Sequence, residues 1–246
     1  MIRFIVVALL IAVLGGAVFL WLSQEEAQLP EMAGYGPNPT LPEPNPTLLP
    51  TVNIAPATQW PEGATPTAAE GFTVYEFAGG LDHPRWLLAL PNGDVLVAES
   101  NAQPKEDQGF SLRGWAMGLI QGQAGAEAPT ADRITLLRDA DGDGVAEVKE
   151  TFLDDLTSPF GMTLAGGTLY VANTDAIVAF PYEEGATSIS AEGRKVADLP
   201  AGPINHHWTK DVIVSQDGST LYATVGSNSN VGENGMEAEQ NRAAVL

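Results

Sequence analysis

Cysteine is absent from the 246 residues of this sequence, and basic residues are few. Without cysteine the chain cannot form disulfides, thiolate metal sites, a nucleophilic thiol or a cysteine-linked lipid anchor. The 11 lysines and arginines are outnumbered by 31 aspartates and glutamates, which gives a formal charge of -20. Because a chain of this charge repels phosphate groups, the composition excludes nucleic acid as a partner. The apolar content of 44% is still enough to build a folded core.

One long apolar run is present, over residues 4–22. As a helix rising about 1.5 Å per residue, it just crosses a hydrocarbon layer of about 30 Å. Arg3 precedes the run, and Glu25 and Glu26 follow it, so the positive-inside rule places the N-terminus in the cytoplasm. We therefore expect residues 1–22 to be a single-pass anchor in a bacterial inner membrane, with the folded part in the periplasm or outside the cell. The alternative is a cleaved signal peptide, whose apolar region is usually about 7–15 residues long.

The composition changes to proline, threonine, asparagine and glutamate over residues 23–70. This segment holds the near-repeat Asn38-Pro39-Thr40-Leu41 and Asn45-Pro46-Thr47-Leu48. Proline at this density prevents regular ladders and favours extended chain. The segment is therefore predicted to be a proline-rich disordered linker.

A strand, turn and strand unit recurs within residues 71–246. It is found at 87–98, at 162–173 and at 212–225, each time around a turn that contains glycine. The irregular spacing suits the blades of a β-propeller, which are about 40–50 residues long, whereas a β-sandwich is the alternative all-β fold. Residues 110–121 depart from this pattern and predict a short helix in a long loop.

Several motifs within residues 71–246 resemble the sorbosone dehydrogenase family, which is related to the soluble glucose dehydrogenases that use pyrroloquinoline quinone (PQQ). The matching motifs are residues 80–86, 133–144, 158–162, 202–210 and 225–230. The resemblance implies a six-bladed propeller in which PQQ accepts a hydride from a sugar or a sugar-derived aldehyde. The electrons would then pass to a respiratory acceptor.

By its place in the motif, His207 matches the general base of the family, and the usual histidine pKa of about 6.5 suits that role. From the residues alone, the alternative is that these adjacent histidines are loop residues hydrogen-bonded to backbone, as histidines at strand ends often are. The residues expected near substrate or cofactor are His206, Asn205, Trp208, Ser158, Ser227 and Asn228. Ser227 stands where glucose-oxidising relatives have an aspartate that orients the base. Lys210 and Asp211 are expected to be solvated.

An acidic loop lies between two expected strands, 134–137 and 148–153. Asp139, Asp141 and Asp143, with Glu150, satisfy the spacing of a twelve-residue calcium loop. The flanking strands exclude an EF-hand, which needs helices on both sides. The pattern predicts a structural Ca²⁺ in this hairpin, and a plain Asp-Gly turn is the alternative.

Residues 71–246 are enough for about four blades at ~45 residues each. The later blades of the family, with the arginines that grip the quinone carboxylates, have no counterpart in this chain. We therefore expect a truncated propeller that is inactive by itself. Two other functions stay open: a non-catalytic propeller that binds a partner or a glycan, and a calcium-dependent lactone hydrolase.

Overall fold

The computed structural model divides the chain into two units, Met1–Pro56 and Ala57–Leu246. Each unit is described by itself. The described residues are 2–22, 29–41, 54–58, 60–61, 63–104, 112–125 and 128–246.

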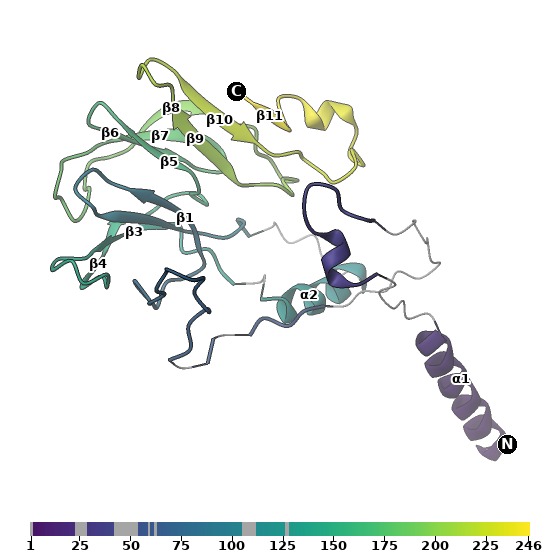
Figure 1. The fold of residues 1–246 in the computed structure, drawn as a ribbon. Coiled ribbons are helices and arrows are strands. Elements are labelled where there is room, and N and C mark those ends of the chain that lie inside the picture. Colours follow the sequence, from purple (N-terminus) through teal and green to yellow (C-terminus); the bar gives the residue numbers. More distant parts are fainter. Residues whose placement is uncertain are drawn as a thin grey trace. The chain divides into compact units, whose positions relative to one another are not determined.

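The first unit contains an apolar helix, α1 (Ile2–Leu22), which Figure 1 shows as a single straight rod. Its segment Phe4–Trp21 has a mean hydropathy of 2.8 and buries none of its side chains in the protein. The predicted helix over residues 4–22 is thus confirmed. Its length and composition suit a membrane span or a signal sequence.

Proline dominates the segment between α1 and the second unit. Among the described residues of 29–70, the regular structure consists of a short 3-10 helix, η1 (Glu31–Gly34), which starts after Pro30. Pro30 fits there because a helix start needs no backbone N–H from the preceding residue. The remainder of the predicted linker, including residues 42–53, lies outside the described residues.

The second unit is built from three antiparallel sheets that follow one another along the chain. The first sheet has the order β1-β2-β3-β4, with β1 (Pro84–Ala89), β2 (Val95–Glu99), β3 (Arg133–Arg138) and β4 (Val148–Leu153). The second has the order β5-β6-β7-β8, with β5 (Met162–Ala165), β6 (Thr168–Ala172), β7 (Ala176–Pro181) and β8 (Arg194–Asp198). The third has the order β11-β10-β9, with β9 (Lys210–Val214), β10 (Leu221–Val225) and β11 (Ala244–Val245).

All three predicted hairpins are confirmed, as β1–β2, β5–β6 and β9–β10. The turn between β5 and β6 consists of Gly166 and Gly167, with φ of 56° and 72°. Two consecutive positive φ angles give the turn whose twist matches antiparallel strands, and glycine adopts them without strain. The hairpins therefore form where the sequence places its turn residues.

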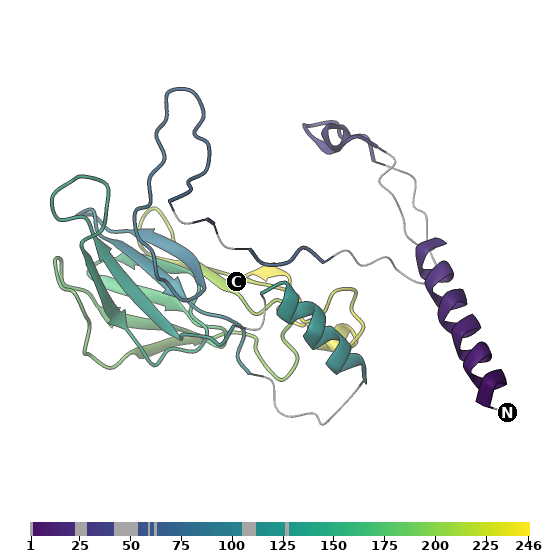
Figure 2. The same cartoon turned by 90° about the horizontal axis from the view of Figure 1, so that it is seen from below.

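The sheets pack face to face through two apolar clusters, and Figure 2 shows them side by side. The first cluster joins the first two sheets through residues such as Leu136, Phe152 and Leu169. The second joins the second and third sheets through residues such as Ile177 and Val212. Strand β1 contacts β5, and β5 contacts β9, so the first strands of the three sheets are neighbours.

The described residues form three sheets, whereas the residue count predicted about four blades. The difference arises because the described residues of 101–132 contain α2 (Leu112–Gln123), after which β3 begins only at Arg133. The predicted helix over 110–121 coincides with α2. Its first two residues, Phe110 and Ser111, lie outside the described residues.

Candidate functional site

His207 lies in the segment between β8 and β9, and we call residues 201–208 the histidine loop. The Nδ1 atom of His207 is 2.8 Å from Ser227 Oγ and 3.2 Å from the backbone oxygen of Ser227. The preceding residue, Gly226, permits this approach, because a Cβ there would lie 2.6 Å from the Cβ of His207. The structure therefore brings the predicted base and Ser227 together.

The Ser227 contacts determine which nitrogen of His207 is free to take a proton. A backbone carbonyl oxygen only accepts hydrogen bonds, so both contacts are satisfied together when Nδ1 carries the proton. In that tautomer Nε2 carries the lone pair, and the exposed ring presents it to solvent. A serine supplies no negative charge, in contrast to the aspartate expected from glucose-oxidising relatives.

Asn228 fixes the histidine loop from one side. Its side chain is buried, and Nδ2 donates to the backbone oxygen of Ile204 at 2.6 Å. The backbone N–H of His206 donates to the backbone oxygen of Asn228 at 3.1 Å. Asn228 therefore acts on the loop through backbone groups, while the His206 ring makes no hydrogen bond within the described part of the chain.

A second set of polar side chains holds the loop from the other side. The Nη1 atom of Arg242 donates to Asn205 Oδ1 at 2.7 Å, and Nη2 donates to the backbone oxygen of Ala201 at 2.6 Å. Asn205 Nδ2 donates to Thr174 Oγ1 at 3.0 Å, and that hydroxyl donates to the backbone oxygen of Trp208 at 2.9 Å. The predicted residues Asn205 and Trp208 are thus joined to Thr174 and Arg242, which no sequence motif indicated.

Lys210 is buried, contrary to the expectation that it is solvated. Its residue exposure is 1%, and Nζ donates to the backbone oxygen of Trp208 at 3.1 Å. Burial, followed by repulsion from Arg242, lowers the pKa of Lys210 to about 8. Asp211 is partly buried as well, and desolvation raises the pKa of its carboxyl group.

Aromatic side chains from all three sheets meet beside the histidine loop. The ring centroids of Trp86 and Phe160 are 5.2 Å apart, and those of Phe160 and Trp208 are 6.5 Å apart in an edge-to-face arrangement. The guanidinium carbon of Arg85 lies 5.2 Å from the Trp208 ring centroid and 6.0 Å from that of Phe160. These residues lie in or just before β1, β5 and β9, so the packing of the sheets brings them together.

Ser158, also predicted to be near the cofactor, lies in a separate polar cluster. Its hydroxyl donates to the backbone oxygen of Asn101 at 2.6 Å, and its backbone N–H donates to Asp132 Oδ1 at 2.8 Å. Its φ is 44°, a conformation that a residue other than glycine adopts at a cost of about 1–2 kcal/mol. No contact between Ser158 and His207 is present among the described residues.

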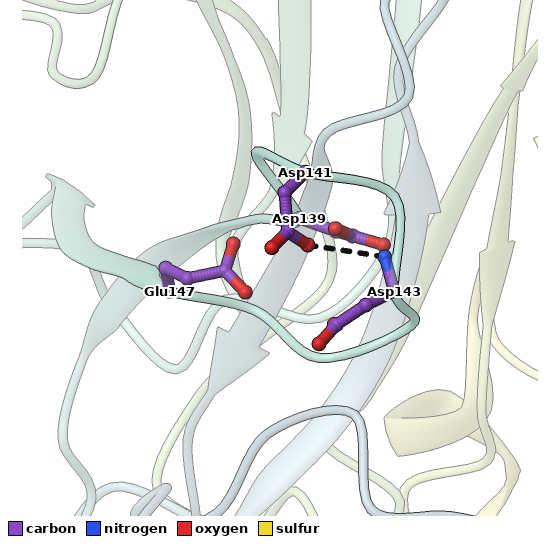
Figure 3. A group of neighbouring side chains, drawn as sticks. All are labelled: Asp139, Asp141, Asp143 and Glu147. Atoms are coloured by element: carbon purple, nitrogen blue, oxygen red, sulfur yellow. Dashed lines mark hydrogen bonds between the residues drawn. The ribbon is translucent and has the colours of Figure 1, made fainter.

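The acidic loop joins β3 to β4, and its carboxylates converge as Figure 3 shows. Oxygens of Asp139, Asp141, Asp143 and Glu147 lie within 4.8 Å of one another. Asp139 accepts hydrogen bonds from the backbone N–H groups of Gly142 and Gly144, and these bonds lower its pKa.

The fourth carboxylate of this group is Glu147, and the structure leaves Glu150 outside it. The ladder between β3 and β4 begins at Val148, so Glu150 pairs with Leu136 inside the sheet. Glu147 lies in the loop itself, where Oε2 accepts a hydrogen bond from the backbone N–H of Ala140 at 2.7 Å. The twelve-residue spacing selects Glu150, whereas the hairpin brings Glu147 to the three aspartates because the β4 ladder already begins at Val148.

Replacing Arg242 with glutamine should lower the free energy of unfolding by about 1–3 kcal/mol, the usual cost of breaking buried hydrogen bonds to a charged group. The change removes the bonds to Asn205 and Ala201. Urea denaturation measures the effect. Arg194→Gln is the matched control, because Arg194 is exposed and its side chain makes no hydrogen bond among the described residues. Equal stability of the two variants would contradict the role of Arg242.

Acid should loosen the segment that follows Asn228. Glu233 accepts hydrogen bonds from the backbone N–H groups of Val231 and Asn230, which lower its pKa to about 2. Glu239 accepts bonds from Ser229 and Asn228, which lower its pKa too. Because the folded-state pKa values are depressed, this stabilisation is complete above the unfolded pKa near 4.5 and is lost as the pH falls toward 2.

Urea denaturation of the wild type and of Glu233→Gln at several pH values measures this effect. The stability difference between the two proteins should be largest at pH 6 and should shrink steadily from pH 4.5 to pH 2. A difference that is independent of pH would show that Glu233 stabilises the segment by means other than its charge.

Solved structures share the fold of the second unit. The holo form of the pyranose dehydrogenase PQQ domain from Coprinopsis cinerea matches with a TM-score of 0.53 and 18% identity, over 73% of this chain and 36% of that chain. The iodide and calcium structures of the Trichoderma reesei carbohydrate-active enzymes family AA12 match with TM-scores of 0.51 and 0.52 and 17% identity. Each covers 73% of this chain, which spans 39% and 38% of their lengths.

The chain therefore spans well under half the length of these three structures, and identity at this level shows a shared fold alone. A search of curated protein sequences finds no match to this chain. The model of a family described as a domain of unknown function, DUF7133, matches residues 70–244. Since this match covers more than half of the chain, the protein belongs to the DUF7133 family.

Proposed function

We propose that the three sheets are consecutive blades of a β-propeller, and that the protein oxidises a sugar or a sugar-derived aldehyde with PQQ as the hydride acceptor. The contacts of β1 with β5 and of β5 with β9 support a radial arrangement of blades. The pyranose dehydrogenase neighbour is a PQQ domain by name, and the AA12 neighbours are carbohydrate-active enzymes by name. The motifs that resemble sorbosone dehydrogenases support the same class of substrate.

The geometry of His207 and Ser227 is the observation that carries this proposal. With Nδ1 bonded to Ser227, Nε2 of His207 takes the proton from the substrate hydroxyl while hydride leaves the adjacent carbon. When bound, the quinone accepts this hydride, so that the substrate gains a C=O bond. The imidazolium of His207 then returns its proton to solvent, to which the ring is exposed.

Arg85 and the aromatic cluster fit a quinone that carries carboxylates. The Arg85 side chain is exposed, and its guanidinium lies over the faces of Phe160 and Trp208. A guanidinium pairs with a carboxylate through two parallel hydrogen bonds, and aromatic faces stack on a planar ring. We therefore assign Arg85 to the carboxylates and Trp208 to the ring. Arg85 belongs to the motif of residues 80–86, but that motif assigned it no role, and no arginine for the quinone was expected in this chain.

Reduction of an artificial dye tests the function on the native protein in its own membrane fraction. We expect dye reduction by sugar only when PQQ and Ca²⁺ are both supplied. Dye reduction without added quinone would show that a group other than PQQ accepts the hydride. A folded protein that reduces no dye in the presence of sugar, PQQ and Ca²⁺ would overturn the proposal in favour of a binding role.

We further propose that the acidic loop binds one structural Ca²⁺ through Asp139, Asp141, Asp143 and Glu147. Four carboxylates at a hairpin tip suit a hard cation with oxygen ligands. Millimolar Ca²⁺ should raise the Tm of the wild type, because a ligand that binds only the folded state stabilises it. Asp143→Asn keeps the Oδ1 acceptor for Val145 but removes a charge, so it should reduce the shift. An equal shift in both proteins would place the cation elsewhere.

We also propose that α1 is an uncleaved anchor of a bacterial inner membrane, with the sheets in the periplasm. Arg3 before the apolar run and Glu25 after it support this orientation. A respiratory electron acceptor in the same membrane would then be near the site. Retention of the protein in the membrane pellet after alkaline carbonate washing tests the anchor, and release would indicate cleavage after α1.

A further inference from the structure

A cavity of about 480 Å³ opens beside the histidine loop. It lies between residues 200–204, at the start of the histidine loop, and the segment 228–242, which follows β10. Small-molecule sites are typically about 300–1,000 Å³, so this cavity has the size of a ligand site. Pro203 and Ile204 contribute apolar surface to it, and Asn234, Glu237, Gln240 and Arg242 contribute polar groups.

Several of these polar groups are free to bind a ligand. Within the described part of the chain, the Glu237 carboxylate and the Gln240 side-chain amide make no hydrogen bond. Asn234 uses Nδ2 to donate to Asn228 Oδ1 at 2.9 Å, and its own Oδ1 accepts nothing among the described residues. Arg242 donates to Asn205 and Ala201 through Nη1 and Nη2, and no carboxylate oxygen lies within 4.0 Å of its guanidinium among those residues.

The mixture of groups selects the chemical class of the ligand. One guanidinium and one carboxylate give the lining no net charge, and an anionic ligand would meet Glu237 and a chain of charge -20. A hydroxyl both donates and accepts, so it can use the carboxylate, the amides and the guanidinium alike. The apolar surface of Pro203 and Ile204 suits the C–H face of a sugar ring.

The cavity shares a wall with the His207 site. Asn228 lines the cavity, and the residue before it, Ser227, contacts His207. Ile204 of the histidine loop also lines the cavity, and its backbone oxygen accepts a hydrogen bond from Asn228. A ligand that reacts at His207 and extends past Ser227 would therefore enter the cavity.

We propose that this cavity binds a neutral sugar ring next to the reacting one, so that the substrate is an oligosaccharide or a glycoside. The assignment of a reacting ring to His207 rests on the proposed function, whereas the binding of the second ring is tested independently of oxidation. The second ring is recognised by Glu237 and Gln240 through hydrogen bonds to its hydroxyl groups.

Calorimetric titration of the full chain with glucose, maltose and cellobiose tests the inference. Lipid nanodiscs are required, because maltoside detergents carry the sugar under test. One disaccharide should bind about tenfold tighter than glucose, the gain expected from one or two hydrogen bonds. Glu237→Ala and Gln240→Ala should each reduce the ratio of the disaccharide affinity to the glucose affinity. Glu192→Ala is the matched control, because Glu192 is exposed and lies outside the cavity.

Each result separates this inference from the proposed function. Oxidation of sugars with no preference for disaccharides would support the proposed dehydrogenase function and contradict a binding site for a second ring. Disaccharide binding that depends on Glu237 and Gln240, without any oxidation, would support the cavity and overturn the dehydrogenase. Disaccharide binding that neither variant weakens would place the second ring elsewhere and overturn the inference.

Discussion

Replacing His207 with asparagine should lower kcat for sugar oxidation by about 10²–10⁴-fold, which is the contribution of a general base. Asparagine keeps a polar side chain that can still contact Ser227, but its amide nitrogen has no basic lone pair. The substrate hydroxyl would then lose its proton to water instead of to Nε2. Steady-state dye reduction with excess PQQ and Ca²⁺ measures the loss, and KM should change much less than kcat.

Two further variants define the role of His207. His206→Asn is the matched control, because the His206 ring makes no hydrogen bond among the described residues. Ser227→Asp places a carboxylate where Nδ1 now contacts a hydroxyl at 2.8 Å, so it should stabilise the imidazolium that forms in the reaction and raise kcat. Equal activity of His206→Asn and His207→Asn would assign the base to another group.

Replacing Lys210 with methionine should raise the free energy of unfolding at pH 7 by about 1–3 kcal/mol. The folded protein holds this ammonium group in a buried place with one neutral acceptor, which lowers its pKa from 10.5 to about 8. A lowering of this size corresponds to about 3 kcal/mol of destabilisation at neutral pH. Methionine fills a similar volume without a charge, and Thr174 Oγ1 still donates to the Trp208 oxygen.

The pH dependence identifies the cause of this gain. Between pH 8 and pH 10.5 the unfolded wild type binds a proton at Lys210 that the folded protein has lost, so wild-type stability should rise through this window. Lys210→Met should lack the rise, and urea denaturation at pH 7 and pH 10 measures it. Lys195→Met is the control, since Lys195 is exposed and its ion pair with Asp198 contributes little. A loss of stability in Lys210→Met at pH 7 would mean that the hydrogen bond to Trp208 outweighs desolvation.

The sheets were predictable from sequence because their signals are local. Gly166 and Gly167 indicate a hairpin turn because glycine adopts the positive φ angles that the turn needs, and alternating apolar residues indicate the flanking strands. The number of sheets was less predictable, because a residue count cannot distinguish strands from the helix and connections of residues 101–132. Counting therefore gave about four blades where the described residues form three sheets.

The candidate site was predictable only where neighbouring residues share one motif. His207, Asn205 and Trp208 lie within one short segment, so a single resemblance named all three as candidates. Thr174 and Arg242 approach this segment from distant parts of the chain, and only folding shows the contact. Lys210 was misjudged because a charged residue is normally exposed, and nothing local shows that its strand starts inside the packed sheets.

The short pairing of β11 with β10 affects the temperature at which the candidate site comes apart. This strand pairs with β10 through two residue pairs, Thr224 with Val245 and Val225 with Ala244. Arg242, which fixes the histidine loop, comes two residues before that short ladder. Short ladders open by local fluctuation at a lower free energy than whole sheets do. Heating should therefore release β11 and the histidine loop while strands β1 to β10 are still folded, so thermal inactivation would precede global denaturation.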